Sequence, residues 1–591
     1  MPAHRSRFRR KAAALALGLL APLAAVPAAQ SAQAATAAVA TPPAAARQVY
    51  EAEDGVLQGV TVASDAPGYT GTGYVDGFDE SGDQVTITVP DSPGGLYDLS
   101  LRYRAPYGDK KTTLLLNGAG AGEVSLSGTE QFADAPAGKV LLKAGRNTIT
   151  VQNDWGWYQV DSISLAPVQP RAAHQVTGDL VDPQATPEAR SLMRYLADHY
   201  GKDLLSGQQD MDSVQWLQDH VGRAPAIAGL DMMDYSPSRV ERGTASQEVE
   251  HALDWDRQGG ITAFVWHWNA PSHLVDQPGE EWWRGFYTDA TTFDLAAALA
   301  DPSSEDYRLL LRDIDAISAQ LSRLQDAQVP VLWRPLHEAE GGWFWWGAKG
   351  PGPAKQLYRL MYDRMVNHNH LHNLIWVWNS VSPDWYPGDD VVDVVSADSY
   401  PPAGDHGPVS ATYDQLLSLG HDGKLAALAE VGSIPDPELT RAYQADWSWF
   451  TTWSGDFLTD GNSNSLDFLK RVYDDSRVIT LDELGDFKHD GGCTAAYDVL
   501  SSWKDGYLVR VTVRNSGTKP INGWRVGWNA PADQRVTEFW NADLKISGTA
   551  RTATDLHWNG ALKPGEQADF YLIGGTPPTA PTTPAPSCAA N

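Results

Sequence analysis

The pattern of apolar and polar positions divides the chain into three regions of different periodicity. Residues 48–167 alternate short β-type runs with turns rich in Gly, Asp and Pro, as in VTITV, YDLSLRY and NTITVQN. Residues 176–486 alternate stretches of helical periodicity with short apolar strands. Residues 493–591 return to strand-like runs, among them GYLVRVTVRN, GWRVGW and ADFYLIG. This pattern predicts a multidomain protein in which two all-β, jelly-roll-like sandwich modules flank a central α/β domain.

The central region has the pattern of repeated parallel βα units. Its clearest helix spans residues 307–326, where Leu310, Ile314, Ile317, Leu321 and Leu324 recur every three or four positions. Eight apolar runs are strand candidates: LLSGQ, APAIAGLD, GGITAFVWHW, VPVLWRPLH, NLIWVWN, VVDVVSAD, LAALAEVG and SWFTTW. Eight such units within residues 176–486 predict a (β/α)8 barrel, the TIM-barrel fold.

The C-terminal strand ends of such a barrel form its active site. In chain order these ends carry Asp231, Asp234, His267, Asn269, His337, Glu338, Asn379, Asp398, Tyr400, Glu430 and Trp453. Aromatic residues accompany them at Trp266, Trp268, Trp343, Trp376 and Trp378. Each polar residue alone could be a strand-end cap, but their convergence on one rim favours a site.

One stretch, residues 330–347 (PVLWRPLHEAEGGWFWWG), carries the clearest chemistry. Its apolar strand ends at His337 and Glu338, and a loop with four aromatic residues follows. A carboxyl group among rings is poorly solvated as an anion, so its pKa rises and it can act as an acid. Indole faces suit the apolar faces of sugar rings. The alternative interpretation is a core strand followed by an aromatic interface loop.

Two carboxylates stand out on the rim, Glu338 after the fourth strand and Glu430 at the end of the seventh. Hydrolysis of a glycosidic bond needs one acid to protonate the leaving oxygen and a second carboxylate opposite it. At a separation of about 5–5.5 Å the second acts as a nucleophile and the anomeric configuration is retained.

Composition narrows the class of partner. The chain has 45 basic and 74 acidic residues, a net charge of -29, which disfavours nucleic acid and acidic membrane surfaces. A neutral polysaccharide is unaffected by that charge, and 23 Trp and 22 Tyr provide rings that bind neutral sugars.

The first 34 residues have the pattern of an export signal, with basic residues from Arg5 to Lys11, an apolar run from Ala12 to Val26, and an Ala32-Gln33-Ala34 cleavage site. We therefore expect a secreted, extracellular protein without a membrane span. Residues 35–47 are predicted to be a disordered lead-in, and residues 168–175 and 487–492 to be linkers. Cys493 and Cys588 are the only cysteines, which in an exported protein predicts one disulfide closing the last module. Nothing in the sequence demands more than a monomer.

The first module carries two candidate binding features. Glu51 and Glu53 open it and Asp161 lies in its last strand, so the three carboxylates meet if the terminal strands pair, which suits calcium. Trp155 and Trp157 stand in a Gly-containing loop suited to sugar stacking, although either could instead pack into the core. No cofactor is expected for catalysis.

The last module carries Trp503, Trp540 and Trp558 between polar or small residues, where a core Trp is unexpected. Three exposed rings on one face would make a flat platform for a crystalline polysaccharide. The alternative is that these side chains cover turns of the module.

The motifs WRPLHEAEGGWFWWG and LAEVG resemble those of glycoside hydrolase family 26, chiefly endo-β-1,4-mannanases. The resemblance implies that Glu338 is the acid/base and Glu430 the nucleophile of a retaining double displacement. It also implies that the subsites are lined by His267, His337, Trp343, Tyr400 and Trp453, with Tyr400 hydrogen-bonded to the nucleophile. Glu340 stands where some members have Asn.

The flanking regions resemble carbohydrate-binding modules. YEAE, GYTGTGYVDGFD and NDWGWYQVD are similar to families 35 and 6, which implies a structural calcium at Glu51, Glu53 and Asp161 and sugar stacking by Trp155 or Trp157. The bracketing cysteines, VTVRNSGTKPINGW and WNA are similar to family 2, which implies cellulose binding through Trp503, Trp540 and Trp558, with Trp524 structural. One departure is PPTAPTTPAP before Cys588, whose prolines predict an irregular edge.

Together these features predict a secreted retaining endo-β-1,4-mannanase acting on mannan, galactomannan and glucomannan and anchored to cellulose. The alternatives are a β-1,3-xylanase or a mixed-linkage β-glucanase on the same barrel, and a non-catalytic plant-wall-binding protein.

Overall fold

The computed structural model describes residues 47–488, 493–504, 506–515, 520–530, 535–547, 549–575 and 586–590. The predicted export signal, the lead-in up to residue 46 and most of the 487–492 linker lie outside these described residues and stay predictions. Among the helices of the described residues, none is both long and apolar enough to cross a membrane.

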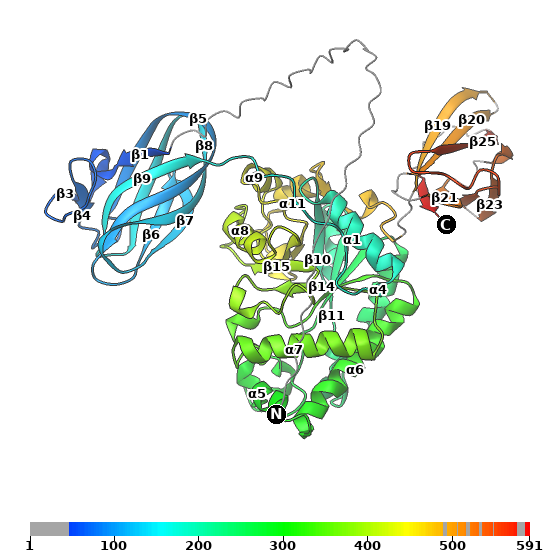
Figure 1. The fold of residues 1–591 in the computed structure, drawn as a ribbon, viewed down its shortest axis with the longest axis horizontal. Helices are drawn as coiled ribbons and strands as arrows, with labels where there is room; N and C mark the ends of the chain where they lie inside the picture. The colour runs from blue at the N-terminus through cyan, green and yellow to red at the C-terminus, as the bar shows by residue number, and fades with distance from the viewer. Residues whose placement is uncertain are drawn as a thin grey trace, which may run out of the picture. The chain divides into compact units, whose positions relative to one another are not determined.

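The central domain is a closed barrel of eight parallel strands (Figure 1). Its strands are β10 (Leu204–Gln209), β11 (Ile227–Asp231), β12 (Ile261–Val265), β13 (Val331–Arg334), β14 (Leu374–Asn379), β15 (Val394–Ser399), β16 (Leu425–Val431) and β17 (Trp449–Thr452). Each strand pairs with the next along the chain, and β10 pairs with both β17 and β11 to close the ring. A short extra strand, β18 (Val478–Ile479), adds to β10. All eight predicted barrel strands are confirmed.

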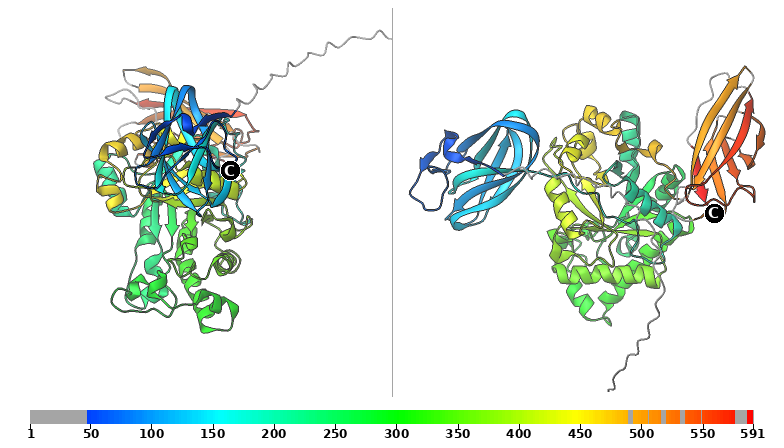
Figure 2. Two further views of the ribbon diagram at one scale, coloured as in Figure 1. Left: turned by 90° about the vertical axis from the view of Figure 1, so that its left-hand side faces the viewer. Right: turned by 45° about the horizontal axis from the view of Figure 1, so that its top comes forward.

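Helices surround the barrel strands (Figure 2). They are α1 (Pro187–His199), α2 (Met211–His220), α3 (Pro237–Val240), α4 (Glu248–Arg257), α5 (Leu295–Ala300), α6 (Glu305–Asp326), α7 (Pro351–Asp363), α8 (Ser410–Leu419), α9 (Pro437–Ala442), α10 (Asp456–Thr459) and α11 (Leu466–Tyr473). Helix α6 confirms the clearest predicted helix and begins two residues earlier, because the Ser304 hydroxyl accepts a hydrogen bond from the Tyr307 amide and caps the first turn. Its five predicted apolar positions are fully buried, and each such side chain stabilises the fold by about 1.5–3 kcal/mol.

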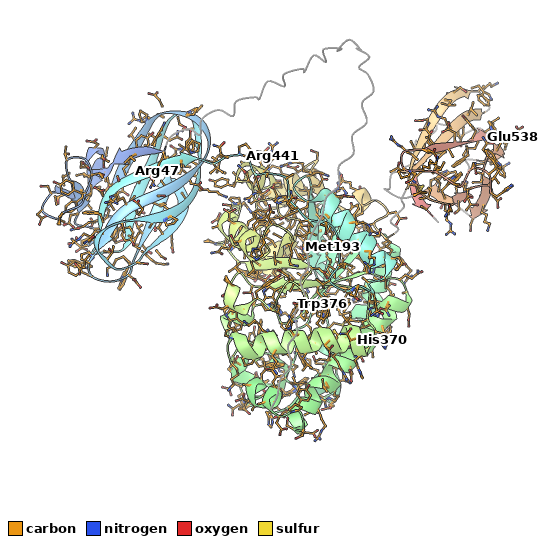
Figure 3. All side chains as sticks on the ribbon, viewed as in Figure 1. Arg47, Met193, His370, Trp376, Arg441 and Glu538 are labelled. Atoms are coloured by element: carbon orange, nitrogen blue, oxygen red, sulfur yellow. A yellow bond between two sulfur atoms is a disulfide. The ribbon has the colours of Figure 1, made fainter. Side chains whose placement is uncertain are left out.

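The barrel has aromatic residues on the outward side of its strands as well as inside. Trp376, which is labelled in Figure 3, and Trp378 both belong to β14 and are fully buried. Their rings meet the ring of Tyr358 on α7. Alternate residues of a strand point to opposite faces, so Val377 between them faces the barrel interior. There it lines a cavity of about 20 Å³ beneath Arg334.

The first module is built from antiparallel strands: β1 (Gln48–Glu51), β2 (Val56–Gln58), β3 (Thr61–Ala63), β4 (Tyr74–Asp76), β5 (Gln84–Ala105), β6 (Lys110–Leu116), β7 (Ala119–Leu126), β8 (Thr129–Trp155) and β9 (Gln159–Pro167). The runs VTITV and YDLSLRY, predicted as separate strands, are halves of β5. This strand pairs with β8 over almost its whole length, with register shifts at Val89/Ser92, Asp98/Ser100 and Tyr103/Ala105. Such bulges let one strand bend without losing its partner. The first and last strands, β1 and β9, pair as expected.

The last module has two four-stranded antiparallel sheets, in the orders β19-β20-β25-β22 and β23-β24-β21-β26. The strands are β19 (Cys493–Trp503), β20 (Gly506–Asn515), β21 (Trp524–Asn529), β22 (Val536–Trp540), β23 (Asp543–Ser547), β24 (Ala550–Thr554), β25 (Gln567–Gly575) and β26 (Ser587–Ala590). Cys493 and Cys588 form the predicted disulfide. Nine of the ten residues of the proline-rich stretch lie outside the described residues, while β26 directly after it pairs with β21.

Candidate functional site

The C-terminal rim of the barrel gathers carboxylates around one buried cation. Arg334, the last residue of β13, donates hydrogen bonds to Asp398 on β15, over 2.8 Å, and to Glu430 on β16. Burial opposes the charge of the guanidinium, but Asp398 and Glu430 outweigh that cost and raise the pKa of Arg334. Burial together with the neighbouring Glu430 and Glu338 raises the pKa of Asp398 well above its usual range, against the pull of Arg334.

Glu430 is held from two sides. Its Oε1 accepts from Arg334, and its Oε2 accepts from the Tyr400 hydroxyl over 2.6 Å. Burial and the proximity of Glu430 raise the pKa of Tyr400, so the phenol stays a donor. The side chain of Glu430 is 5 % exposed, and its two oxygens are both oriented by charged or strongly polar donors. This is the geometry of a fixed carboxylate anion.

Glu338 lies opposite, in a backbone conformation that side chains rarely adopt. Its φ is 51° and that of Leu336 is 54°, both in the left-handed region. The Glu338 amide donates to Asn379 Oδ1 over 2.9 Å, and the Asn379 amide group donates in turn to Asp398. This pairing fixes the turn that carries the carboxyl group to the rim.

The environment of the Glu338 carboxyl group favours its protonated form. Burial is the main cause of a raised pKa, and the negative charge of Glu430 adds to it. A hydrogen bond from Trp343 Nε1, over 2.9 Å, acts in the opposite direction, as do the charges of Arg334 and His267. Glu338, Asp398 and Glu430 each bring one oxygen within 4.8 Å of the other two. The two glutamates therefore combine close spacing with different environments, a protonatable acid facing a fixed anion.

Two histidines complete this side of the rim. His337 is buried, and its Nε2 lies 3.2 Å from Nε2 of His267. His267 Nδ1 lies 2.6 Å from Asp231 Oδ2. The His267 ring also meets the ring of Trp453 edge to face, at 6.1 Å between centroids. The structure thus brings together Glu338, Glu430, His267, His337, Trp343, Tyr400 and Trp453, all named from the sequence.

Some rim residues turn away from this cluster. Asp234 pairs with Arg239, and Asn269 is fully buried and hydrogen-bonded to Ser238. The expected aromatic wall is also wrong in part, because Trp343 alone of its loop is largely exposed, at 49 %. The aromatic residues that instead pack into the core are Trp345, Trp346, Trp266, Trp268, Trp376 and Trp378, while the buried ring of Phe344 meets those of His267 and His337. These tryptophan rings fill the layer around the barrel, where burying large apolar surface stabilises the fold.

Arg334 was not predicted as a site residue. The signal was present in the run VLWRPLH, because an arginine inside an apolar barrel strand is buried only when carboxylates pair with it. Asp398 and Asn379 were predicted on the rim, and the structure adds the reason for their presence, which is to hold Arg334 and the Glu338 turn.

The first module brings its three acidic residues to one loop, residues 70–73. Glu53 Oε1 accepts from the Thr72 and Gly73 amides, and Glu51 accepts from the Thr70 hydroxyl. Gly71 approaches so closely that a Cβ atom there would lie 2.2 Å from Glu53 Oε1. Burial, and then the charges of Glu53 and Asp161, raise the pKa of Glu51.

The negative charges of Glu51, Glu53 and Asp161 at this loop would favour a bound cation. Glu53 Oε2 is buried and has no hydrogen-bond partner among the described residues. Asp161, however, already pairs with Arg102 over 2.9 Å, and the three carboxylates do not bring one oxygen each within 4.8 Å. Glu53 Oε2 is therefore an available ligand atom, whereas the Asp161 oxygens already accept from the Thr70 amide and pair with Arg102, so the three carboxylates would have to move closer together to share an ion.

Both tryptophans of the 153–158 loop are exposed, Trp155 at 66 % and Trp157 at 61 %. Trp157 meets the exposed ring of Tyr107 edge to face, at 6.4 Å between centroids. Trp155 borders a hollow of about 300 Å³ that Asp109, Lys110 and Ser127 also line. Neither ring packs into the core, which overturns the alternative interpretation for both.

The last module exposes its three predicted tryptophans and buries the fourth. Trp503, Trp540 and Trp558 are 50 %, 40 % and 62 % exposed, whereas Trp524 is fully buried. Trp540 stacks on Tyr571 of β25, at 5.4 Å and 11°. Trp503 lies over Gly506, where a Cβ atom would come within 2.9 Å of the indole. Alternation along the paired strands places Trp503, Trp540 and Tyr571 on the outer face of one sheet.

Comparison with known families matches all three regions. Residues 181–483 match glycosyl hydrolase family 26, residues 48–168 match the family 35 carbohydrate binding module, and residues 493–590 match the cellulose binding domain family.

Individual relatives agree with these families. A mannan endo-1,4-beta-mannosidase of Thermothelomyces thermophilus is 54 % identical over 445 residues, covering 75 % of this chain and 92 % of the relative. The crystal structure of a Podospora anserina GH26-CBM35 beta-(1,4)-mannanase is 51 % identical with a TM-score of 0.58, covering 75 % of this chain and 99 % of that one. A ruminal GH26 endo-beta-1,4-mannanase is 28 % identical with a TM-score of 0.59, covering 74 % and 98 %. The chain therefore belongs to glycosyl hydrolase family 26.

Proposed function

We propose that this protein is a retaining endo-β-1,4-mannanase that hydrolyses internal bonds of mannan, galactomannan and glucomannan. The observation that carries the proposal is the pair Glu338 and Glu430, which face each other with oxygens within 4.8 Å. Oxygens this close fit the separation of about 5–5.5 Å between the carboxyl groups of a retaining enzyme better than the about 6.5–9.5 Å of an inverting one, which must also hold a water molecule. The names of the most similar relatives support mannan as the substrate.

Glu430 and Glu338 have different roles in the two steps of the reaction. Glu430, fixed by Arg334 and Tyr400, attacks the anomeric carbon while Glu338 donates its proton to the leaving glycosidic oxygen. The bond from sugar to leaving oxygen breaks as the bond from sugar to Glu430 forms. Glu338, now an anion, then removes a proton from a water molecule that attacks the same carbon and releases Glu430.

The raised pKa of Glu338, caused mainly by burial and then by Glu430, favours its first role as an acid. As negative charge leaves Glu430 in the covalent intermediate, the repulsion that raises the Glu338 pKa disappears. The same residue is therefore an acid in the first step and a base in the second. His267, His337, Trp343, Tyr400 and Trp453 line the sugar subsites around the scissile bond.

The flanking modules supply binding rather than chemistry. Trp503, Trp540 and Trp558 form the platform that binds cellulose, and Trp155 and Trp157 stack against a soluble mannan chain. Because mannan lies alongside cellulose in plant walls, anchoring to the crystalline polymer raises the local concentration of substrate without changing the reaction. Such a substrate requires an exported enzyme, in agreement with the signal predicted at the N-terminus, and the protein acts as a monomer.

The substrate is tested by reducing-sugar release from galactomannan, glucomannan, β-1,3-xylan and mixed-linkage glucan. We expect release from the two mannans alone, with first-formed reducing ends in the β configuration by NMR. Glu430→Ala and Glu338→Ala should each lower turnover of polysaccharide by at least about 10³-fold, since each removes an essential group. Release from xylan or glucan alone would overturn the substrate, first-formed α ends would overturn retention, and no release would favour a binding protein.

The pH dependence tests the role of Glu338. Trp343→Phe removes a hydrogen bond that stabilises the Glu338 anion, so the pKa of Glu338 should rise further. Because the acid works protonated, the alkaline limb of kcat/KM should move to higher pH, by up to about one unit. Trp283→Phe is the matched control, since Trp283 is also 49 % exposed but forms no hydrogen bond to Glu338. A limb that stays in place in Trp343→Phe would contradict the assignment.

Cellulose binding is tested by a pull-down with microcrystalline cellulose. Trp503→Ala should weaken retention by up to about tenfold, because a ring contact of this kind is worth roughly 0.5–1.5 kcal/mol beyond the area that it buries. Kinetics on soluble mannan should not change. Ile546→Ala is the control, because Ile546 is 51 % exposed on the other sheet of the module. Equal retention of the Trp503 variant and the control would argue against the platform.

Calcium binding is tested by unfolding the protein in EDTA and in excess calcium. If Glu51 and Glu53 hold the ion, calcium should raise the unfolding temperature of the first module, and a concentration 100 times Kd corresponds to about 2.7 kcal/mol. Glu53→Gln should abolish that shift without changing hydrolysis of soluble mannan. An unfolding temperature that is the same in EDTA and in calcium would rule the ion out.

A further inference from the structure

Asp231 is fixed at the edge of the active site by contacts on both of its oxygens. Its Oδ1 accepts from the Met233 amide over 2.8 Å and from the His267 amide over 3.1 Å. Its Oδ2 faces His267 Nδ1 at 2.6 Å. β11 and β12 are neighbours in register, with Asp231 opposite Val265, so the strand ends themselves set this contact. No step of the proposed reaction uses Asp231.

The contact between the two histidine rings needs one proton. His267 Nε2 and His337 Nε2 lie 3.2 Å apart, so one nitrogen donates and the other accepts. An ionised carboxylate only accepts, so His267 carries a proton on Nδ1 toward Asp231. If the shared proton also belongs to His267, that ring is an imidazolium. His337 is then neutral, with its own proton on Nδ1.

The groups around the two rings determine whether His267 or His337 carries the shared proton. Burial opposes a charge on His267, but Asp231, and to a lesser extent Glu430, raise its pKa. Burial, then the positive charges of His267 and Arg334, lower the pKa of His337 well below its usual range. The groups that face His267 are Asp231, His337, Arg334, Glu338 and Glu430, together with the rings of Phe286, Phe344 and Trp453. The carboxylates Asp231 and Glu430 favour a proton on His267 and outweigh the opposing charge of Arg334, whereas buried His337 has no such compensation.

We propose that Asp231 is a positioning residue that keeps His267 as an imidazolium and directs its Nε2–H at a neutral His337. This proposal rests on the proposed glycosidase function and adds a fixed positive charge to the site beside the two glutamates. That charge restrains the upward shift of the Glu338 pKa, which burial and Glu430 produce. A restrained shift suits a residue that donates a proton in the first step and accepts one in the second.

The substitution Asp231→Asn tests this arrangement through the direction in which the alkaline limb of the kcat/KM pH profile moves. Asn Oδ1 can accept from the two backbone amides as Asp231 Oδ1 does, which turns the NH2 group toward His267 Nδ1. His267 must then accept at Nδ1 and becomes neutral, as in other carboxylate–histidine pairs. Loss of the imidazolium raises the pKa of Glu338, so the alkaline limb of kcat/KM on soluble mannan should move to higher pH. A shift of about one unit is the expected size.

The opposite sign would overturn the proposal. If His267 kept its proton in Asp231→Asn, the variant would have lost one negative charge, which lowers carboxyl pKa values and moves the limb to lower pH. Asp234→Asn is the matched control, because Asp234 lies on the same rim and pairs with Arg239 rather than with His267. Asp231→Glu, which keeps the carboxylate, should return the limb toward its wild-type position. An unmoved limb in Asp231→Asn also overturns the proposal.

A second readout does not depend on catalysis. Nitrogen-15 NMR of the imidazole groups, with His267→Gln to assign the signals, should show both His267 nitrogens protonated in the wild type near neutral pH. In Asp231→Asn the His267 signals should become those of a neutral ring protonated on Nε2. A neutral His267 in the wild type would overturn the proposal even if mannan is hydrolysed. A wild type that hydrolyses no polysaccharide, but whose His267 is an imidazolium, would refute the proposed function alone.

Discussion

The active site depends on the burial of one guanidinium group among carboxylates. Arg334 is almost fully buried, and its charge is compensated by Asp398 and Glu430. Removal of one partner from a buried ion pair costs about 3–5 kcal/mol, because the other charge remains without compensation. Here the loss of Arg334 would leave two buried carboxylates facing each other and Glu338 nearby. Arg334 therefore provides the charge compensation that holds Asp398 and Glu430 together at this depth.

The closed barrel is what makes this arrangement possible. Arg334, Asp398 and Glu430 end β13, β15 and β16, and β14 between them contributes Asn379, which bonds both to Asp398 and to the backbone of Glu338. In an open sheet these strand ends would form a line, whereas ring closure by β10 and β11 turns them toward a common centre. The left-handed backbone at Leu336 and Glu338 then carries the Glu338 carboxyl group out of the strand direction to face Glu430. Strain of this kind persists where the surrounding contacts hold it.

Sequence patterns predicted the barrel because each strand is a short apolar run and each helix has its own periodicity. They predicted both glutamates because a polar residue directly after an apolar run marks the end of a strand. They could not show which aromatic side chains face the cleft. Strands of a parallel barrel are buried on both faces, so their sequences lack the alternation that separates inside from outside. Trp376 and Trp378 therefore look like cleft residues in the sequence and prove to pack against α7. In the last module, where one face of a strand meets water, the expectation that a Trp between polar or small residues is exposed is confirmed for Trp503, Trp540 and Trp558.

This contrast explains how one residue type serves three purposes in the same chain. In the barrel, most tryptophan rings are buried and contribute packing, whereas Trp343 is exposed and its indole nitrogen donates to the Glu338 carboxyl group. In the last module the exposed rings lie over a glycine and over Tyr571, so their orientation is fixed before any ligand arrives. A preformed platform loses little conformational entropy on binding. Because ring stacking on a neutral sugar does not depend on net charge, a chain with a charge of -29 can bind such polymers without electrostatic steering.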